Sequence, residues 1–381
     1  MKIAIVHDCI FNKGGAERVL LNMHKAFPDA PIFTSVYDKT NSYSEFEDCD
    51  IRTTWLQRLA PNEKCYKKLF MIFFVMRAMQ SHNLSDYDLI LLSSTHNAKY
   101  VKSGKNSFLI NYCYTPFRLA WDPSSYNVYE KSKGIKLFFL NIIINLLKKT
   151  DYYYAQRVNK YIAMTNETSD RIKRCYGLKK GIKIIKPSID TSKYYVSKNN
   201  DNYYLVVSRL EKYKKVDLVI KAFNISGYKL KIVGRGMEEN SLKKIANNNI
   251  EFLGSVSQDE LVKVYSKCKA LIFPQHEDYG LTPLEANASG RPVIAYGHGG
   301  IRYTMIPYQT ENPNSEFTAI FFNNQNPSSL NKAVDLLENL NINKNFIRTH
   351  AEKYDNNIFV KELKSFVEKE YNKFKNNANT K

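Results

Sequence analysis

The chain has 381 residues with a formal net charge of +19, and 44% of its residues are hydrophobic. This length predicts two domains, and the apolar content excludes a mainly disordered chain. The positive charge favours anionic partners such as diphosphates or an acidic membrane surface. Six cysteines without C-x-x-C spacing, and a strand that follows Lys2 directly, predict reduced thiols in a cytosolic protein without a targeting segment.

The first predicted element is a buried strand at residues 3–6, which runs into the glycine pair Gly14-Gly15. A helix with apolar residues at helical spacing follows from Ala16. Further strand patterns at 32–36 and 89–93 alternate with helices. This alternation predicts an α/β fold with a doubly wound first domain.

Two apolar runs flanked by lysines occur at residues 64–82 and 133–149. Both are shorter than the roughly 18–20 apolar residues that a membrane span needs. One interpretation is a buried helix of the first domain. The other is a helix that lies in the membrane interface with its lysines at lipid headgroups. We therefore expect a peripheral rather than an integral membrane protein.

Polar and aromatic residues cluster after the next strands. His96 follows strand 89–93 and is a candidate to approach a substrate, although a lone histidine is more often structural. Arg118, Trp121 and Asp122 could line an acceptor site, and the alternative is a packed, salt-bridged loop.

A polar stretch at 191–202 predicts an interdomain linker before the strand at 204–207. A basic cluster that includes Arg209 and Lys214 follows this strand, and without further evidence it would be a solvated face. The glycine turn after Val233 lacks the third glycine of a dinucleotide fingerprint, so NAD is not predicted.

Residues 271–300 hold the most informative pattern. An apolar strand runs into a loop with Glu277 and Gly280, and a helix then starts at Thr282 with Pro283 in its first turn. Free backbone amides at such a helix start can bind an anion. Glu285 could instead complete a capping box with Thr282, which is a purely structural role.

Glu277 and Glu285 have seven residues between them, followed by Ala-Ser-Gly-Arg-Pro-Val-Ile-Ala and by Gly-Gly. This stretch resembles the Glu-x7-Glu signature of retaining glycosyltransferases of the GT-B fold, family four, group 1, in their mannosyltransferase-like branch. The resemblance implies two Rossmann-like doubly wound domains facing an interdomain cleft. The acceptor-side domain would comprise residues 1–190 and the nucleotide-sugar domain residues 203–355. Residues 356–381 would form a closing helix with a polar tail.

The resemblance also implies site roles. Glu285 would bind the ribose, and Glu277 would lie against the donor sugar. We take Glu277 as catalytic, together with His96, whose position at the end of strand 89–93 could bring it to the sugar. Tyr114, a further acceptor-side candidate, stands directly before Thr115-Pro116, where many relatives carry histidine. The donor diphosphate would be held by Gly14, Gly15, Arg209, Lys214, Gly280, Leu281 and Thr282. We expect no metal and no cofactor, and we interpret the Asp-x-Asp pairs at 48–50 and 86–88 as solvated carboxylates.

We therefore expect a metal-independent, retaining transferase that moves a hexose, mannose from GDP-mannose, to a lipid-linked or growing cell-surface polysaccharide such as a capsule or lipopolysaccharide. It would lie in the cytoplasm on the inner face of the plasma membrane, with an anionic membrane surface as partner and no nucleic acid. The alternatives are a GT-B epimerase or phosphorylase, and a non-enzymatic basic membrane-surface binder.

Overall fold

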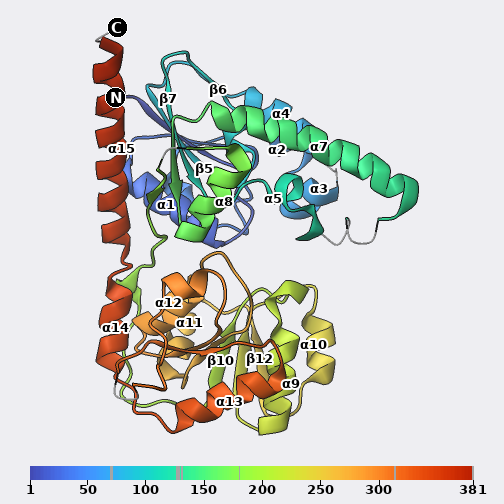
Figure 1. Cartoon of the computed structure of the whole chain (residues 1–381), viewed down its shortest axis with the longest axis vertical. Coiled ribbons are helices and arrows are strands. Elements are labelled where there is room, and N and C mark those ends of the chain that lie inside the picture. The colour runs from blue at the N-terminus through green and yellow to red at the C-terminus, as the bar shows by residue number, and fades with distance from the viewer. Residues whose placement is uncertain (69–71, 126–128, 130–131, 180, 313–314, 380–381) are drawn as a thin grey trace. The chain divides into compact units, whose positions relative to one another are not determined.

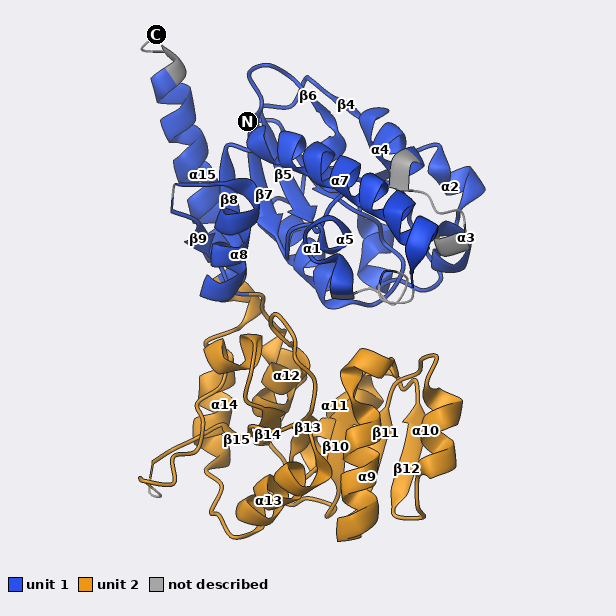
Figure 2. Cartoon of the chain, turned by 45° about the vertical axis from the view of Figure 1, so that its right-hand side comes forward, with its two compact units in different colours: residues 1–186, 359–381 blue, residues 187–358 orange. Residues whose placement is uncertain are grey.

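The computed structural model describes residues 1–68, 72–125, 129, 132–179, 181–312 and 315–379 (Figure 1). The chain divides into two compact units, residues 1–186 with 359–381 and residues 187–358 (Figure 2). Each unit is built on a parallel sheet, so the predicted α/β class is confirmed. Residues 191–202, predicted as a linker, belong to the second unit.

The sheet of the first unit has seven parallel strands. In spatial order they are β3 (Ile51–Thr53), β2 (Ile32–Thr34), β1 (Ile3–His7), β5 (Leu89–Ser94), β7 (Phe108–Cys113), β8 (Lys160–Ala163) and β9 (Lys183–Ile184). The central strands β5 and β7 are buried along their whole length, as parallel strands covered on both faces should be. Two short strands, β4 (Asn83–Leu84) and β6 (Lys102–Ser103), pair separately.

Helices surround this sheet. They are α1 (Gly15–Ala26), α2 (Leu56–Leu59), α3 (Glu63–Lys68), α4 (Ile72–Gln80), α5 (Arg118–Trp121), α7 (Gly134–Gln156), α8 (Asn166–Tyr176) and the C-terminal α15 (Asn356–Asn379). From residue 359 on, α15 belongs to the first unit. There the ring of Phe374 stacks on Phe108 with centroids 4.8 Å apart, and Glu370 pairs with Lys160 at 2.6 Å.

The two lysine-flanked apolar runs differ in the structure. In the first, Val75, Ala78 and Met79 of α4 are buried, although residues 69–71 lie outside the described part of the chain. In the second, α7 leaves Ile135 and Phe138 largely exposed. The interpretation of 133–149 as a buried helix is therefore wrong for the outer part of α7, because only its inner face packs on the unit.

The second unit has a six-stranded parallel sheet. Its strands, in spatial order, are β12 (Ile250–Gly254), β11 (Leu230–Val233), β10 (Tyr204–Val207), β13 (Leu271–Phe273), β14 (Val293–Tyr296) and β15 (Ala319–Phe322). Its helices are α9 (Val216–Ser226), α10 (Glu239–Ile245), α11 (Gln258–Lys267), α12 (Thr282–Ala288), α13 (Pro327–Glu338) and α14 (Lys344–Glu352).

Local sequence sets where these helices begin. The Ser257 hydroxyl accepts a hydrogen bond from the Glu260 amide at the start of α11, and Asn326 caps the Ser329 amide just before Pro327 of α13. The apolar faces of α9 and α13 then pack together with β10, β11 and β15 in one core cluster. This core fixes the strand ends from which the candidate site is built.

Candidate active site

In the second sheet the strand order reverses between β10 and β13. Chain connections leave these neighbouring strands at their carboxyl ends in opposite directions, which opens a crevice where ligands of α/β proteins bind. The loop after β10 carries Arg209 and Lys214, and the loop after β13 carries Glu277 and Gly280. The topology therefore brings together residues that lie more than 60 positions apart in sequence.

Lys214 and Glu277 form an ion pair at this point. The side chain of Lys214 is 13% exposed and that of Glu277 is 23% exposed. Such a pair is only partly desolvated, so both groups stay within reach of a ligand from solvent. Lys214, which the basic cluster alone would leave on a solvated face, is thus paired with the carboxylate of Glu277.

The backbone beside Glu277 is held by Gly299 and Gly300, which precede and begin a short 3₁₀ turn. The Gly300 amide donates to the Glu277 carbonyl at 2.7 Å, and Gly299 pairs with Glu277 as an isolated bridge. A Cβ on Gly300 would lie 2.2 Å from the Asp278 carbonyl oxygen. The glycine pair is therefore needed because two backbone segments touch there.

Gly280 has a φ of +94° and its Cα faces the ring of Phe273, so that a Cβ would come within 2.8 Å of that ring. Leu281 and Thr282 follow at the start of α12. The prediction of a Thr282 cap is wrong, because Leu281 is the residue before the helix and no side chain caps the helix start. Pro283 is in the first turn, as predicted.

The capping-box interpretation of Glu285 is also wrong. Its Oε2 accepts a hydrogen bond from the Tyr265 hydroxyl at 2.8 Å, and the residue is buried. Burial raises the pKa of Tyr265 well above its usual value, and the neighbouring Glu285 carboxylate raises it further. Tyr265, which is in α11 and was not predicted from sequence, therefore remains a neutral donor that fixes the carboxylate.

Arg209 is exposed, and its Nη2 donates to the Tyr213 hydroxyl at 2.8 Å. The Nζ of Lys214 lies 5.1 Å from the centre of the Tyr213 ring. Tyr213 thus contacts both predicted diphosphate ligands. Gly234, in the loop after β11, has a φ of +128°, and a Cβ there would overlap the Ser208 carbonyl oxygen. The glycine therefore allows this loop to lie against the backbone at Ser208.

The first sheet reverses its order between β1 and β5, and the residues that meet there are Asp8 and the 95–98 loop. Asp8 is buried and accepts hydrogen bonds from the amides of Thr95 (2.7 Å), His96 (3.1 Å) and Ala98 (2.7 Å), and from the Thr95 hydroxyl (2.6 Å). Burial raises the pKa of Asp8, but the hydrogen bonds and charge of His96 and the bond from Thr95 outweigh it and hold the pKa well below its usual range.

Asp8 was not among the predicted site residues, although its position at the end of the first strand is a signal. Its carboxylate also lies 3.7 Å from Nδ1 of His96. The His96 ring stacks on Phe117 with centroids 4.6 Å apart. His96 borders a small hollow, whose other lining residues are Met76, Asn97, Tyr100, Phe117, Leu147 and Thr150.

The remaining predicted residues of the first unit make internal contacts. The Tyr114 hydroxyl bonds Ser93 Oγ at 2.8 Å and donates to the Ala16 carbonyl. The indole Nε1 of Trp121 donates to Asp151 at 2.8 Å. Arg118 opens α5, and Asp122, just after α5, accepts from the Ser124 hydroxyl at 2.8 Å.

Gly14 directly precedes α1, and Gly15 is its first residue. A Cβ on Gly14 would lie 2.3 Å from Oε2 of Glu17, so the glycine makes room for that buried carboxylate. In the described residues no group of three or more His, Cys, Asp or Glu side chains could hold a metal ion.

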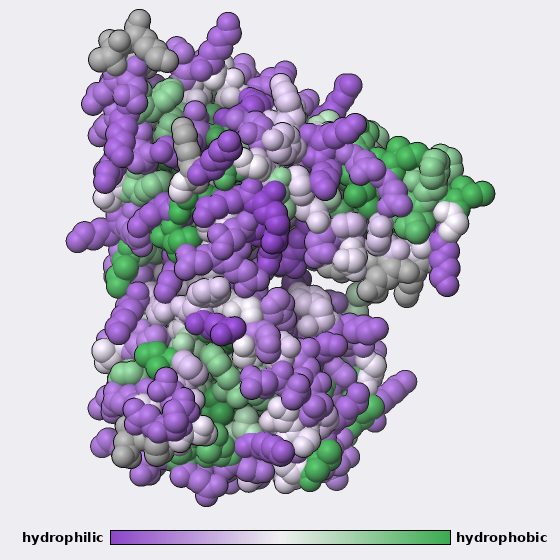
Figure 3. All heavy atoms as spheres, in the orientation of Figure 1, coloured by the Kyte–Doolittle hydropathy of each residue, from purple (hydrophilic) through white to green (hydrophobic). Residues whose placement is uncertain are grey.

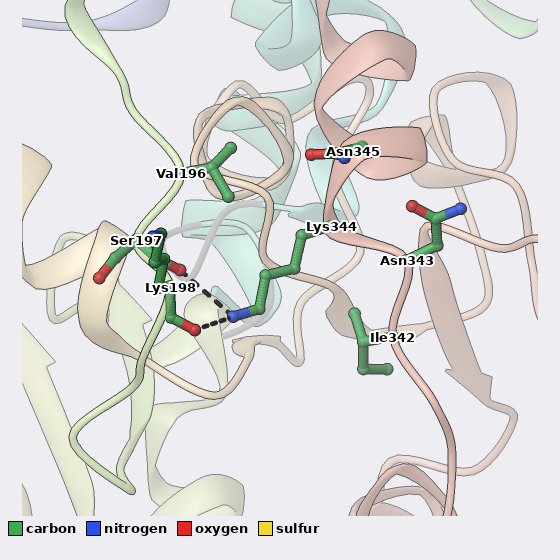
Figure 4. Close-up of a pocket in the computed structure, with 7 residues that line it drawn as sticks. All are labelled: Val196, Ser197, Lys198, Ile342, Asn343, Lys344 and Asn345. Carbon is green, nitrogen blue, oxygen red and sulfur yellow. Dashed lines mark hydrogen bonds between the residues drawn. The ribbon is translucent and has the colours of Figure 1, made fainter.

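A larger hollow of the second unit lies away from these residues (Figure 4). It is lined by residues 196–198 and 342–345. Figure 4 shows the Lys344 amine pointing to the carbonyls of Ser197 and Lys198, to which it donates. The Arg291 guanidinium donates to the Asn199 carbonyl at 2.8 Å. These cations hold an extended segment in place, and the hollow contains none of the predicted site residues.

Two α/β units, each with a parallel sheet whose strand order reverses once, define the fold class as the GT-B type. Solved structures share the fold. An Anabaena protein, Alr3699/HepE, solved in complex with UDP, has a TM-score of 0.68 at 16% identity, covering 97% of this chain and 100% of that one. Sucrose-phosphate synthase from Thermosynechococcus elongatus has a TM-score of 0.70 at 14% identity, covering 97% and 99%.

Family models identify the chain more closely. Residues 13–193 match the model of Glycosyltransferase Family 4, and residues 189–378 match that of Glycosyl transferases group 1. The chain therefore belongs to the family-four, group 1 glycosyltransferases that these two models describe, and it is a glycosyltransferase. It is similar to the alpha-1,3/1,6-mannosyltransferase ALG2 of Candida glabrata, with 23% identity over 82% of this chain and 79% of the relative. It is also similar to the O-antigen chain mannosyltransferase RfbU of Salmonella typhimurium, with 31% identity over 36% of this chain and 42% of the relative.

Proposed function

We propose that the chain transfers a hexose with retention of configuration and without a metal, and that the sugar is mannose from GDP-mannose. The observation that carries the proposal is the partly buried Lys214–Glu277 ion pair at the strand-order reversal of the second unit. The names of the similar mannosyltransferases support the choice of sugar.

In this proposal Lys214 and Arg209 bind the donor diphosphate. When the glycosidic bond to the diphosphate breaks, negative charge grows on the leaving oxygen, and an ammonium and a guanidinium stabilise it in place of a metal ion. Donor binding then exchanges the Glu277 partner of Lys214 for phosphate oxygens. The backbone amides of Gly280, Leu281 and Thr282 would donate to the same diphosphate.

Glu277, released from Lys214, would accept hydrogen bonds from the hexose hydroxyls and stabilise the positive charge that develops at the anomeric carbon. Glu285 would bind the ribose hydroxyls, with the Tyr265 hydroxyl fixing its orientation. In the first unit, Gly14 and Gly15 would add amide donors for the phosphates. His96 would contact the reacting groups, and Tyr114, Arg118, Trp121 and Asp122 would form the acceptor side.

For the acceptor we propose a lipid-linked or growing cell-surface glycan. A peripheral position on the inner face of the plasma membrane would give the protein both a cytosolic nucleotide sugar and a membrane-held acceptor. No helix of the described residues is long and apolar enough to cross a membrane.

The proposal is tested by thermal unfolding of the full chain in the presence of GDP-mannose, GDP-glucose, UDP-glucose and UDP-N-acetylglucosamine. Binding to the folded state raises the unfolding temperature by mass action, so GDP-mannose should give the largest rise. The Lys214→Met variant should lose the rise, and Lys231→Met, which removes a lysine paired with Glu251 elsewhere on the sheet, should keep it.

Product analysis separates the alternatives. Mannose transferred to a membrane extract with the anomeric configuration kept supports the proposal. A changed hexose without acceptor would indicate an epimerase, and phosphate-dependent release of a sugar phosphate would indicate a phosphorylase. No response to any nucleotide sugar would favour a binder without enzymatic activity.

A further inference from the structure

Helix α7 of the first unit has two apolar faces. Its inner face packs on the unit through Ile144, Leu147 and Ala155, all of them buried. The opposite face carries large apolar side chains that are at least half exposed, namely Ile135 (78%), Phe138 (64%), Phe139 (59%), Ile142 (50%) and Leu146 (50%). An ordinary surface helix exposes its polar face instead.

These exposed residues form one stripe. The other four residues lie three, four, seven and eleven positions after Ile135. At about 100° per residue, all five fall within a sector of the helix about 100° wide. At about 1.5 Å per residue the stripe is about 17 Å long. Figure 3 shows apolar side chains gathered over the outer end of α7, at the right-hand edge of the view.

The charge on the helix is one-sided. All of Gly134–Gln156 is described, and its one acidic residue, Asp151, is fully buried and pairs with the equally buried Lys99 at 2.7 Å. Lys136, Lys148 and Lys149 are exposed, as is Lys133 just before the helix. The exposed charges of α7 are therefore all positive, and they lie on the same helix as the exposed apolar side chains.

We propose that this stripe of α7 lies in the headgroup region of an anionic lipid bilayer. Interfacial helices bury an apolar face at the level of the upper acyl chains while lysines contact acidic headgroups. Tyr153, 66% exposed, extends the stripe toward the end of the helix with a side chain suited to the same region. A second copy of the chain fits less well, since facing stripes would bring lysine against lysine without an exposed acid on the helix.

The proposal rests on the proposed function and adds to it the surface that reaches the acceptor. Leu147, on the inner face of α7, and Thr150, beside the stripe, line the hollow that His96 borders. The helix that would rest on the lipid is thus also a wall of the hollow that His96 borders, and His96 is the residue proposed to contact the reacting groups. An acceptor anchored in the same membrane would reach His96 from the bilayer surface.

The test is co-flotation of the full chain with vesicles of phosphatidylcholine, with and without phosphatidylglycerol. Wild type should float with the acidic vesicles and less with the neutral ones. Ile135→Glu should bind about tenfold more weakly, because an apolar side chain that would be buried in the lipid is replaced by a charge that acidic lipids repel. Glutamate in the first turn of a helix is favourable, so the variant keeps its fold.

The matched control is Ile225→Glu in the second unit, where an isoleucine of nearly equal exposure, 75%, lies at the end of α9. It should float like wild type. Wild type that stays free of acidic vesicles, or Ile135→Glu that floats as well as wild type, would overturn the proposal. So would a wild-type dimer that Ile135→Glu makes monomeric while flotation is unchanged.

Thermal stabilisation by GDP-mannose, measured on the same samples, separates this proposal from the proposed function. Ile135→Glu should keep the donor response of wild type while it loses flotation. Loss of flotation together with the donor response and cooperative unfolding would mean that the variant is misfolded, and Phe139→Glu then repeats the test at a second position of the stripe.

Discussion

The two units place a carboxylate at the same topological point and use it differently. In the first unit Asp8 lies where the strand order reverses, is 6% exposed and is bound by three backbone amides and a hydroxyl. In the second unit Glu277 lies at the corresponding point, is 23% exposed and pairs with the side chain of Lys214. The fold therefore fixes where the acidic group lies, and the loops decide how many donors hold it and how far it is exposed.

The difference follows from the donors that each loop offers. The 95–98 loop presents consecutive amides to Asp8, and these bonds cannot be released without unfolding the loop. Lys214 is a single flexible cation that can turn to a phosphate when one binds. In this comparison the first carboxylate holds His96 in place, and the second would be free to meet a donor in the function we propose.

The largest effect is expected for Glu277→Gln. The amide keeps the size of the side chain and removes the charge, so the transfer rate should fall about a hundredfold through lost stabilisation of the anomeric centre. The measurement is the rate of mannose transfer at saturating donor. Glu251→Gln, which breaks the ion pair with Lys231 at 3.3 Å, is the control and should retain wild-type rates. Equal rates in the two variants would remove Glu277 from the chemistry.

Asp8→Asn should act on stability. The Asp8 carboxylate accepts hydrogen bonds from four donors. In the variant the NH2 group of the amide must face one of these donors. We expect this to lower the free energy of unfolding by about 2–4 kcal/mol. Denaturant unfolding measures it, with Asp170→Asn on the exposed side of α8 as the control. If both variants unfold at the wild-type denaturant concentration, the structural role assigned to Asp8 is wrong.

Tyr265→Phe sharpens the role of Glu285. Loss of one buried hydrogen bond is worth about 1 kcal/mol, so GDP should bind about fivefold more weakly. Pyrophosphate has no ribose and should bind as to wild type. Calorimetric titration of both ligands makes the comparison, and Tyr203→Phe, which removes a hydroxyl bound to the Val264 carbonyl, is the control. Equal weakening of GDP and pyrophosphate binding would assign Tyr265 a general structural role.

The smallest effect concerns His7 at the end of β1. Burial lowers its pKa below 6.5, although Asp8 opposes the shift. Between the two pKa values the unfolded chain binds more protons than the folded one. The free energy of unfolding is therefore highest, as far as His7 affects it, above pH 6.5, and it falls as the pH drops toward the depressed pKa of the folded state. His7→Gln should reduce the slope of unfolding free energy against pH by at most about 1.4 kcal/mol per pH unit. Exposed His298→Gln is the control, and identical slopes for all three proteins would contradict the burial argument.

Much of the fold follows from local patterns. The apolar runs at 3–6, 204–207 and 271–274 predict β1, β10 and β13, because buried parallel strands need continuous apolar residues. The exposed stripe of α7 is harder to predict, since its two apolar faces average to an apolar helix and sequence alone does not say which face is covered.

The site was only partly predictable. The spacing of Glu277 and Glu285 identifies the family signature, but the interaction of Glu285 with Tyr265 depends on how α11 and α12 pack. The four donors of Asp8 come from a loop almost 90 residues further along the chain, and no short-range pattern indicates them. The capping box failed for the same reason: the local motif is present, but Glu285 lies within reach of a buried hydroxyl from another helix.

Calorimetric titration of GDP-mannose into wild type, Lys214→Met and Lys231→Met tests most directly whether the ends of β10 and β13 form the donor site. The account predicts that Lys214→Met binds at least about tenfold more weakly, since a charge-assisted contact to the diphosphate is lost, and that Lys231→Met binds like wild type. Equal affinity of Lys214→Met and wild type would contradict it.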